Sequence, residues 1–369
     1  MKWPLNWLML AVPLLLLLAV SAAATSTPTR KLKHASGPIV TLAMDGPRVV
    51  YSTQGNRVYV WNIRTGVTSQ ARDFSSSTYP LVQEVAIAGT RVAWITRDVA
   101  GNSQETNEDL YTASLNGAGT KQLAHAFRSW DFTEHHGPLW RGDWIGGLVG
   151  SGSVLGVSRW TTTPNDDTGA ETISNARLSL ISAGGGRLHP LLAGEQSIVS
   201  RSADAGRVAV LRPDESVGIY SAAGALLRQI EPSSAQEIAM GGGHLVVLTK
   251  TKALEVYDAK TGAFKHSWPV KTKAAYLHPG YLRAYGRIAI LSVAPGHSSR
   301  NLRFIDLRTG RAITLPSINR SAWNDAAVGP LGVVYAVSNG KAYGGHVPSG
   351  TLVFLSTARV LADISRGQP

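Results

Sequence analysis

Short apolar runs, each introduced by a glycine, recur along most of this chain. Every run continues into β-branched, aromatic or leucine residues, as in Val49-Val50-Tyr51 and Val246-Val247-Leu248. Such runs of four to eight residues between turn residues are typical of β-strands. The seven copies start at Gly46, Gly89, Gly152, Gly206, Gly243, Gly286 and Gly332.

A second strand and a turn follow most of the copies. The predicted second strands include Val58–Trp61, Leu110–Ala113, Leu178–Ile181, Leu254–Tyr257 and Leu302–Ile305. Glycine-containing turns come next, for example Thr65-Gly66 and Thr261-Gly262, and glycine suits such turns because they need positive φ. The glycine-led run is the predicted inner strand of each antiparallel unit, and an outer strand after the turn completes the unit.

The apolar runs indicate sheets that are buried on both faces. A one-sided antiparallel sheet alternates apolar and polar residues, whereas Val49-Val50-Tyr51 is apolar at successive positions. A sandwich core would bury such strands too, but it would not repeat one unit seven times. We therefore predict an all-β fold, a seven-bladed β-propeller of four-stranded antiparallel blades, with six or eight blades as the alternatives.

Three parts of the chain depart from the repeated pattern, namely two long intervals between copies and the C-terminal segment. We predict that the polar segments 98–109 and 160–175 are loops inserted on one face of the disc. No helix of convincing length and period is predicted. The propeller domain should span residues 38–364, and its last segment, Ala358–Ile364, should be a strand that pairs with the N-terminal blade. Residues 365–369 are predicted to be a tail.

The first residues have the layout of a secretory signal peptide. Lys2 precedes an apolar stretch from Leu8 to Val20, and Ala22-Ala23-Ala24 supplies small residues for cleavage after Ala24. Residues 1–24 are therefore predicted to be removed, and residues 25–37 to form a flexible leader. The alternative is an uncleaved anchor, although the apolar stretch is shorter than the roughly 20 residues of a spanning helix.

Charge and cysteine content narrow the class of protein. The chain has 369 residues, a formal net charge of +12 and no cysteine. The missing cysteines exclude disulfides, thiolate metal sites and cysteine nucleophiles, and they favour a bacterial source. No nucleic-acid motif accompanies the dispersed Lys and Arg residues, so we expect no specific nucleic-acid binding. Electrostatic contact with an anionic cell-envelope surface is the more plausible use of this charge.

One segment resembles a repeat of the quinoprotein-like propellers. Val256–Trp268 contains an Asp, a Thr-Gly turn and a later Trp, and that family docks this Trp onto the neighbouring blade. Phe304–Gly310 and Trp61–Gly66 match in part. The chain is also similar to TolB-like and WD40-like repeat proteins of bacterial envelopes. The resemblance implies a propeller, and its non-catalytic members include outer-membrane assembly scaffolds.

The candidate ligand site is a segment unusually rich in tryptophan, histidine and acids. Aromatic side chains provide stacking surfaces, and neighbouring acids provide hydrogen bonds to a peptide or carbohydrate. Alternatives are a metal site formed by Asp131 with the two histidines, and a purely structural role in filling gaps between blades. The candidate residues are Trp130, Asp131, His135, His136, Trp140 and Trp144.

These observations favour a binding protein over an enzyme. No GxSxG nucleophile motif is present, and the glycine triplets do not precede a predicted helix. We expect an exported, monomeric, non-enzymatic binding or scaffold propeller that recognises a protein, peptide or polysaccharide and carries no cofactor or metal. The alternative is an extracytoplasmic hydrolase or lyase with its site in the central channel.

Overall fold

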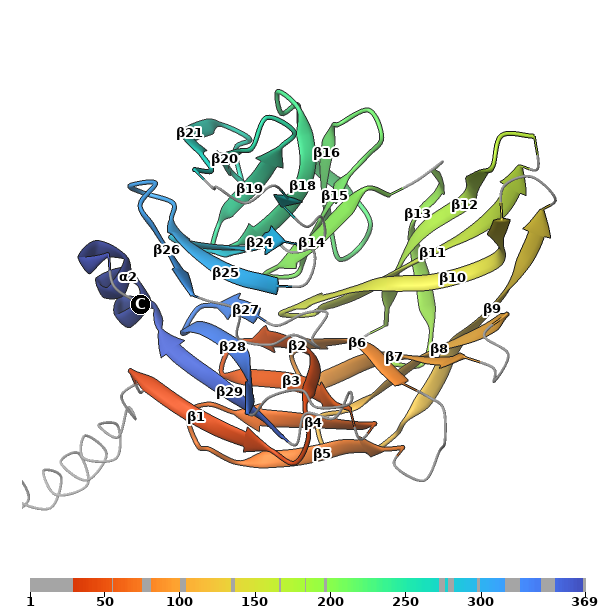
Figure 1. The fold of residues 1–369 in the computed structure, drawn as a ribbon, viewed down its shortest axis with the longest axis horizontal. Helices are drawn as coiled ribbons and strands as arrows, with labels where there is room; N and C mark the ends of the chain where they lie inside the picture. Colours follow the sequence, from red (N-terminus) through yellow and green to blue (C-terminus); the bar gives the residue numbers. More distant parts are fainter. Residues whose placement is uncertain are drawn as a thin grey trace, which may run out of the picture.

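The protein is an all-β propeller, seen here in a computed structural model. The structure describes residues 29–54, 56–74, 81–99, 104–133, 137–165, 167–182, 184–195, 198–271, 276–277, 282–296, 299–315, 326–339 and 349–367. All strand pairs are antiparallel, and the sheets are arranged around an axis (Figure 1). The predicted signal peptide, residues 1–24, lies outside the described residues. No described helix is long and apolar enough to span a membrane.

The described strands form six hydrogen-bonded sheets, so the predicted count of seven separate blades is not what the pairing gives. Five of the sheets have four or five strands. The first contains β2 (Ile39–Asp45), β3 (Arg48–Thr53), β4 (Arg57–Asn62) and β5 (Thr68–Asp73). A second sheet contains β14 (Ser200–Asp204), β15 (Arg207–Leu211), β16 (Val217–Ser221) and β17 (Leu226–Ile230). A third contains β18 (Ala235–Gly241), β19 (His244–Thr249), β20 (Ala253–Asp258) and β21 (Phe264–Pro269).

The sheets nearest the C-terminus follow the same pattern. The five-stranded sheet contains β22 (Tyr276–Leu277), β23 (Arg283–Tyr285), β24 (Ile288–Gly296), β25 (Ser299–Asp306) and β26 (Ala312–Leu315). The last sheet contains β27 (Ala326–Gly329), β28 (Gly332–Asn339), β29 (Ser349–Ser356) and the N-terminal strand β1 (Arg30–Ala35).

The sixth sheet has eight strands because two successive meanders are joined. Its strands are β6 (Leu81–Ala88), β7 (Arg91–Val99), β8 (Glu105–Ser114), β9 (Lys121–Thr133), β10 (Gly137–Ser151), β11 (Val154–Asn165), β12 (Ala170–Ile181) and β13 (Leu188–Glu195). The long strands β9 and β10 pair from Gly137↔Thr133 to Gly142↔Arg128. The predicted loops at 98–109 and 160–175 were therefore wrong, because most of these residues extend the strands.

Each of the seven predicted glycine-led runs is a strand, but it is the second strand of its unit and not the innermost one. The glycine lies in the turn after an inner strand that the sequence analysis did not identify, such as β2 before Gly46. The second strand has paired strands on both edges and packed sheets on both faces, so it is the most apolar. Val49, Val50, Val246 and Val247 are accordingly 0% exposed.

Polar side chains on the inner strands connect neighbouring units. The carboxylate of Glu84 on β6 accepts a hydrogen bond from the Leu148 main-chain N–H at 2.7 Å. Glu237 on β18 accepts one from the Leu282 N–H at 2.6 Å. Each bond satisfies a main-chain donor that has no strand partner on the axial side, and a buried donor left unsatisfied costs about 1–3 kcal/mol.

The ring is closed by the N-terminal strand and not by the C-terminal segment. β1 pairs with β29 from Arg30↔Leu355 to Ala35↔Gly350, so residues 30–35 of the predicted flexible leader are ordered. The predicted strand at Ala358–Ile364 is a helix, α2 (Thr357–Arg366). Ser356 caps its N-terminus by accepting a hydrogen bond from the Arg359 N–H, and Gly367 ends it in the left-handed conformation.

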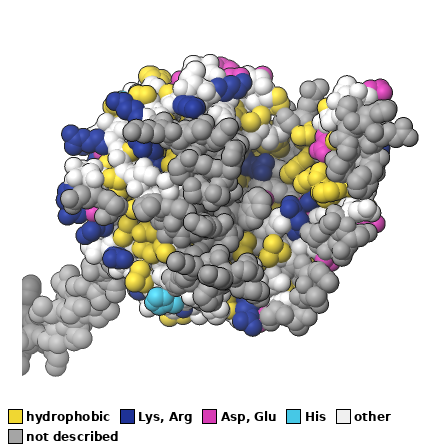
Figure 2. All heavy atoms as spheres, in the orientation of Figure 1, with side chains coloured by type: hydrophobic (Ala, Val, Ile, Leu, Met, Phe, Trp, Pro, Cys, Tyr) yellow, Lys and Arg dark blue, Asp and Glu magenta, His cyan; other side chains and the backbone are white. Residues whose placement is uncertain are grey.

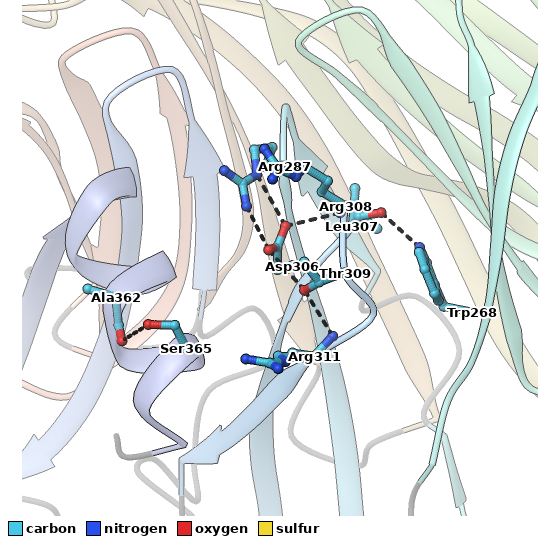
Figure 3. Close-up of polar contacts among 9 residues, drawn as sticks. All are labelled: Trp268, Arg287, Asp306, Leu307, Arg308, Thr309, Arg311, Ala362 and Ser365. Atoms are coloured by element: carbon cyan, nitrogen blue, oxygen red, sulfur yellow. Dashed lines mark hydrogen bonds and ion pairs between the residues drawn. The ribbon is translucent and has the colours of Figure 1, made fainter.

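The Trp268 indole docks onto the next unit. Its Nε1–H donates to the Leu307 carbonyl at 2.8 Å, and the ring packs over Gly310, where an added Cβ would lie 2.6 Å from the indole (Figure 3). The turn that receives it is shaped by Asp306, which accepts hydrogen bonds from the Arg308 N–H and the Thr309 hydroxyl. The sequence resemblance implied this docking of a tryptophan after a Thr-Gly turn.

Candidate functional site

The long strands of the eight-stranded sheet project from the disc (Figure 1). We call residues 126–133, 137–146, 158–165 and 170–176 the long-strand arm. Strand register places two tryptophan pairs on it: Trp140 faces Trp130 on β9, and Trp144 faces Trp160 on β11. Since side chains alternate along a strand, Trp140 and Trp144 lie on the same face of β10.

The four indole rings form a continuous ladder on this face. Trp130 and Trp140 meet edge to face with ring centroids 4.8 Å apart. Trp140 and Trp144 are 5.8 Å apart, also edge to face. Trp144 and Trp160 are 5.8 Å apart and nearly parallel, at 8°. The Trp144 Nε1–H donates to the Thr162 hydroxyl at 2.8 Å. The ladder therefore fixes the relative positions of β9, β10 and β11.

A buried arginine lies within the ladder. The Arg128 guanidinium carbon is 3.5 Å from the Trp144 ring centroid and 5.1 Å from that of Trp140. Such cation–π contacts are worth about 2 kcal/mol or more when desolvated. Because β10 lies between β9 and β11, Arg128 and Trp160 flank the Trp144 ring from opposite sides. Arg128 is 1% exposed.

Glu108 neutralises this arginine. Its carboxylate lies 2.8 Å from Arg128 and 2.7 Å from Arg97, and it also accepts the Ile145 main-chain N–H at 3.0 Å. Burial alone would raise the pKa of Glu108, but the hydrogen bonds and charges of Arg128 and Arg97 hold that pKa below its ordinary value. At neutral pH Glu108 is therefore a carboxylate that holds the arm to β8.

The arm also exposes apolar side chains to solvent. Phe127 on β9 is 44% exposed and Ile173 on β12 is 41% exposed. Hydrophobic side chains lie beside Lys and Arg side chains on the arm side of the disc (Figure 2). Exposed apolar groups on a rigid, projecting element are a common feature of binding surfaces.

The structure brings together part of the predicted ligand site. Trp130, Trp140 and Trp144 are neighbours in one cluster, as the prediction required. The backbone of Asp131 belongs to β9, but its side chain lies outside the described residues, as do His135 and His136. Three residues of this cluster were not among the predicted site residues, namely Arg128, Trp160 and Glu108. Two-residue alternation along 126–130 would have placed Arg128 on the same face as Trp130.

Residues 167–169 form the described part of the turn between β11 and β12. The side-chain oxygen of Asn165 accepts hydrogen bonds from the Asp167 and Thr168 main-chain N–H groups. The same arrangement occurs at Asp258 with Lys260 and Thr261. Within the described residues, no group of three or more His, Asp and Glu side chains has the spacing of a metal site.

A separate candidate site is a channel along the axis of the disc. This axial channel has a volume of about 370 Å³. Residues of seven inner strands line it, namely β2, β6, β10, β14, β18, β23 and β27. Its charged side chains include Asp45, Glu84, Arg201 and Asp204.

Comparisons with known proteins give no family. No family model and no curated protein matches the chain. Solved structures similar over most of their length include the two that follow. The computationally designed Ika8 protein is 16% identical, with 88% of this chain and 98% of that chain covered and a TM-score of 0.45. A chain of the mitotic checkpoint complex is 15% identical, with 91% and 97% covered and a TM-score of 0.48. Neither likeness bears on activity.

Proposed function

We propose that this protein is an exported, non-enzymatic binding propeller that holds a protein or peptide partner on the long-strand arm. The observation that carries the proposal is the Trp–Arg ladder together with the exposed Ile173, which pairs with Thr162 on the ladder face of the arm. The ladder gives the arm a fixed shape, so little conformational entropy is lost when a partner binds.

The ladder favours a polypeptide over a polysaccharide partner. Carbohydrate rings stack on open aromatic faces, but Arg128 and Trp160 already flank the ring of Trp144. The surface left for a partner on this face is made of ring edges and of the apolar side chain of Ile173, because Phe127, next to Arg128 on β9, points to the opposite face. Apolar residues of a protein or peptide cover such a surface well.

Two further parts of the proposal concern architecture and location. We propose that the eight-stranded sheet counts as two blades, which makes seven blades in all, because β6–β9 and β10–β13 are each a four-stranded meander. The seven inner strands along the channel support this count. The predicted signal peptide supports a location outside the cytoplasm, where the net charge of +12 favours an anionic envelope surface.

Site-specific photo-crosslinking in the producing cells tests the partner proposal. A photoreactive amino acid replaces Ile173 in one variant, and Leu226 in a control variant. Leu226 is 50% exposed on the outer strand β17, away from the arm. We expect a discrete crosslinked protein from position 173 that is absent from position 226. The same pattern from both positions, or a crosslink only from position 226, contradicts the proposal.

A further inference from the structure

Arg201 and Asp204 line the described part of the axial channel without an ion pair. Arg201 on β14 donates from Nε to the Gly147 carbonyl at 2.8 Å, and its terminal nitrogens make no other hydrogen bond or ion pair with described residues. Asp204 on the same strand is only 5% exposed and likewise has no described hydrogen-bond or ion-pair partner. Both side chains line the channel.

The Arg201 side chain has a dedicated place in the wall. Gly147 has φ 63° and no side chain, and a Cβ at this position would collide with the guanidinium. Burial lowers the pKa of Arg201, and only the charge of Glu84 acts in the opposite direction. A guanidinium stays protonated nonetheless, so the wall holds a half-buried cation that a ligand carboxylate would stabilise.

The other charged groups at this level are already engaged. The Glu84 carboxylate accepts the Leu148 main-chain N–H, and the Glu237 carboxylate accepts that of Leu282. Arg283 donates to the Leu282 carbonyl at 2.8 Å. Glu84, Glu237 and Arg283 together with Arg201 make two anions and two cations, so recognition there depends on the direction of the Arg201 donors rather than on net charge.

The other end of the channel is acidic. Asp204 and Asp45 both lie near Tyr285, whose pKa is raised by burial and then by these two carboxylates. Both oxygens of Asp45 are occupied by the Gly89 and Gly152 main-chain N–H groups, at 2.8 and 3.0 Å. Asp204 therefore remains the acceptor for a ligand cation, and Tyr285 offers a hydroxyl beside it.

The positions of Arg201 and Asp204 along β14 give a scale for the ligand. They are three residues apart, so their backbone positions are separated by about 10 Å along the strand, and their side chains leave opposite faces of it beside the channel. An extended peptide advances about 3.3–3.6 Å per residue, so three residues span a similar length. The inner strands also have no neighbouring strand on the axial side, and such free edges bind extended peptides through main-chain hydrogen bonds.

We propose that the axial channel binds a short zwitterionic peptide of two or three residues, with its carboxylate on Arg201 and its ammonium group on Asp204. This site is separate from the arm and does not depend on the function proposed for the arm. The channel volume of about 370 Å³ is in the range of small-ligand pockets.

Isothermal titration calorimetry of the purified protein with three probes tests this site. The probes are tri-alanine, N-acetyl-tri-alanine and tri-alanine amide. We expect tri-alanine to bind, and each capped peptide to bind at least tenfold more weakly. R201Q should weaken tri-alanine about tenfold without a further effect on the amide, and D204N should weaken tri-alanine without a further effect on the acetylated peptide.

Matched controls separate this site from the rest of the molecule. Arg177 is exposed on β12 and Asp143 is exposed on β10, so R177Q and D143N remove the same charges elsewhere and should leave tri-alanine binding unchanged. Capped peptides that bind the wild-type protein as tightly as tri-alanine overturn the proposal even if R201Q fails to fold. So does the absence of binding by all three probes at millimolar concentration. Loss of binding by arm variants such as I173D would place the peptide on the arm and also overturn it.

Discussion

At the scale of single residues, Glu108 determines whether the arm is stable. The carboxylate is 1% exposed and contacts two arginines and one main-chain N–H. Removing one partner of a buried pair leaves an uncompensated charge, and this costs far more than the net contribution of the pair itself. The ladder tryptophans and Arg128 therefore depend on a residue that does not touch the partner surface.

We predict that E108A lowers the free energy of unfolding by about 3–5 kcal/mol, because Arg128 would remain buried without a counter-charge. The control is D73N, which breaks the exposed Arg57–Asp73 pair and should change stability little. Urea denaturation followed by tryptophan fluorescence measures both. Equal, small effects of E108A and D73N would show that Glu108 does not hold the arm.

The same residue predicts a dependence on pH. The pKa of Glu108 is below its ordinary value in the folded protein, so its contribution is complete above its unfolded pKa and is lost as pH falls through the lowered value. Unfolding free energy measured from pH 7 to pH 3 should therefore fall less steeply in E108Q than in the wild-type protein. Parallel curves would contradict this assignment.

Sequence reasoning identified residue types but not the face on which they lie. The tryptophan-rich segment was recognised because of its composition, and three of its tryptophans do cluster. Arg128 was missed because it lies outside that segment, and only the pairing of β9 with β10 brings it against Trp144. Cross-strand register depends on tertiary pairing, which a single sequence specifies weakly.

At the scale of elements, the strands were predictable and their order within a unit was not. The glycine-led runs are the most buried strands, and their apolar composition alone predicts an innermost position for them. The inner strands instead border the channel and carry polar residues such as Glu84 and Arg201. The helix α2 was missed because a ten-residue amphipathic segment at the end of a strand-rich chain has an ambiguous hydrophobic period.

The docking of Trp268 on Gly310 connects two sheets, and it yields a prediction. G310A should destabilise the protein more than G262A. Both glycines have positive φ, at 68° and 78°, but only a Cβ at 310 would approach the indole as closely as 2.6 Å. Thermal unfolding of the two variants in the wild-type and W268A backgrounds measures the coupling. We expect the difference to vanish when Trp268 is removed, and a persistent difference would contradict this packing.

At the scale of the whole molecule, closure of the ring depends on the N-terminal strand. β1 supplies the outer strand of a sheet whose other three strands come from the C-terminal end of the chain. Residues 25–37 appeared to be a leader because they are polar, but Lys31, Leu32 and Lys33 pair with β29. The predicted cleavage after Ala24 would leave β1 intact.

A truncation series tests this closure. Removal of residues 1–28 should leave the melting temperature unchanged. Removal of residues 1–35 should lower it strongly, because the main-chain groups of β29 would lose their partners from Arg30 to Ala35. Differential scanning calorimetry compares the two proteins. A shared melting temperature would contradict closure by β1.

The central claim is that the long-strand arm holds a polypeptide partner, and its most direct test is the affinity of the partner identified by crosslinking at position 173. Surface plasmon resonance compares the wild-type protein with I173D and with two controls, F127D on the opposite face of the arm and L226D on β17. All three variants place a charge at an exposed apolar position. The account predicts at least tenfold weaker binding for I173D and unchanged binding for F127D and L226D. Equal affinity of all four proteins would contradict it.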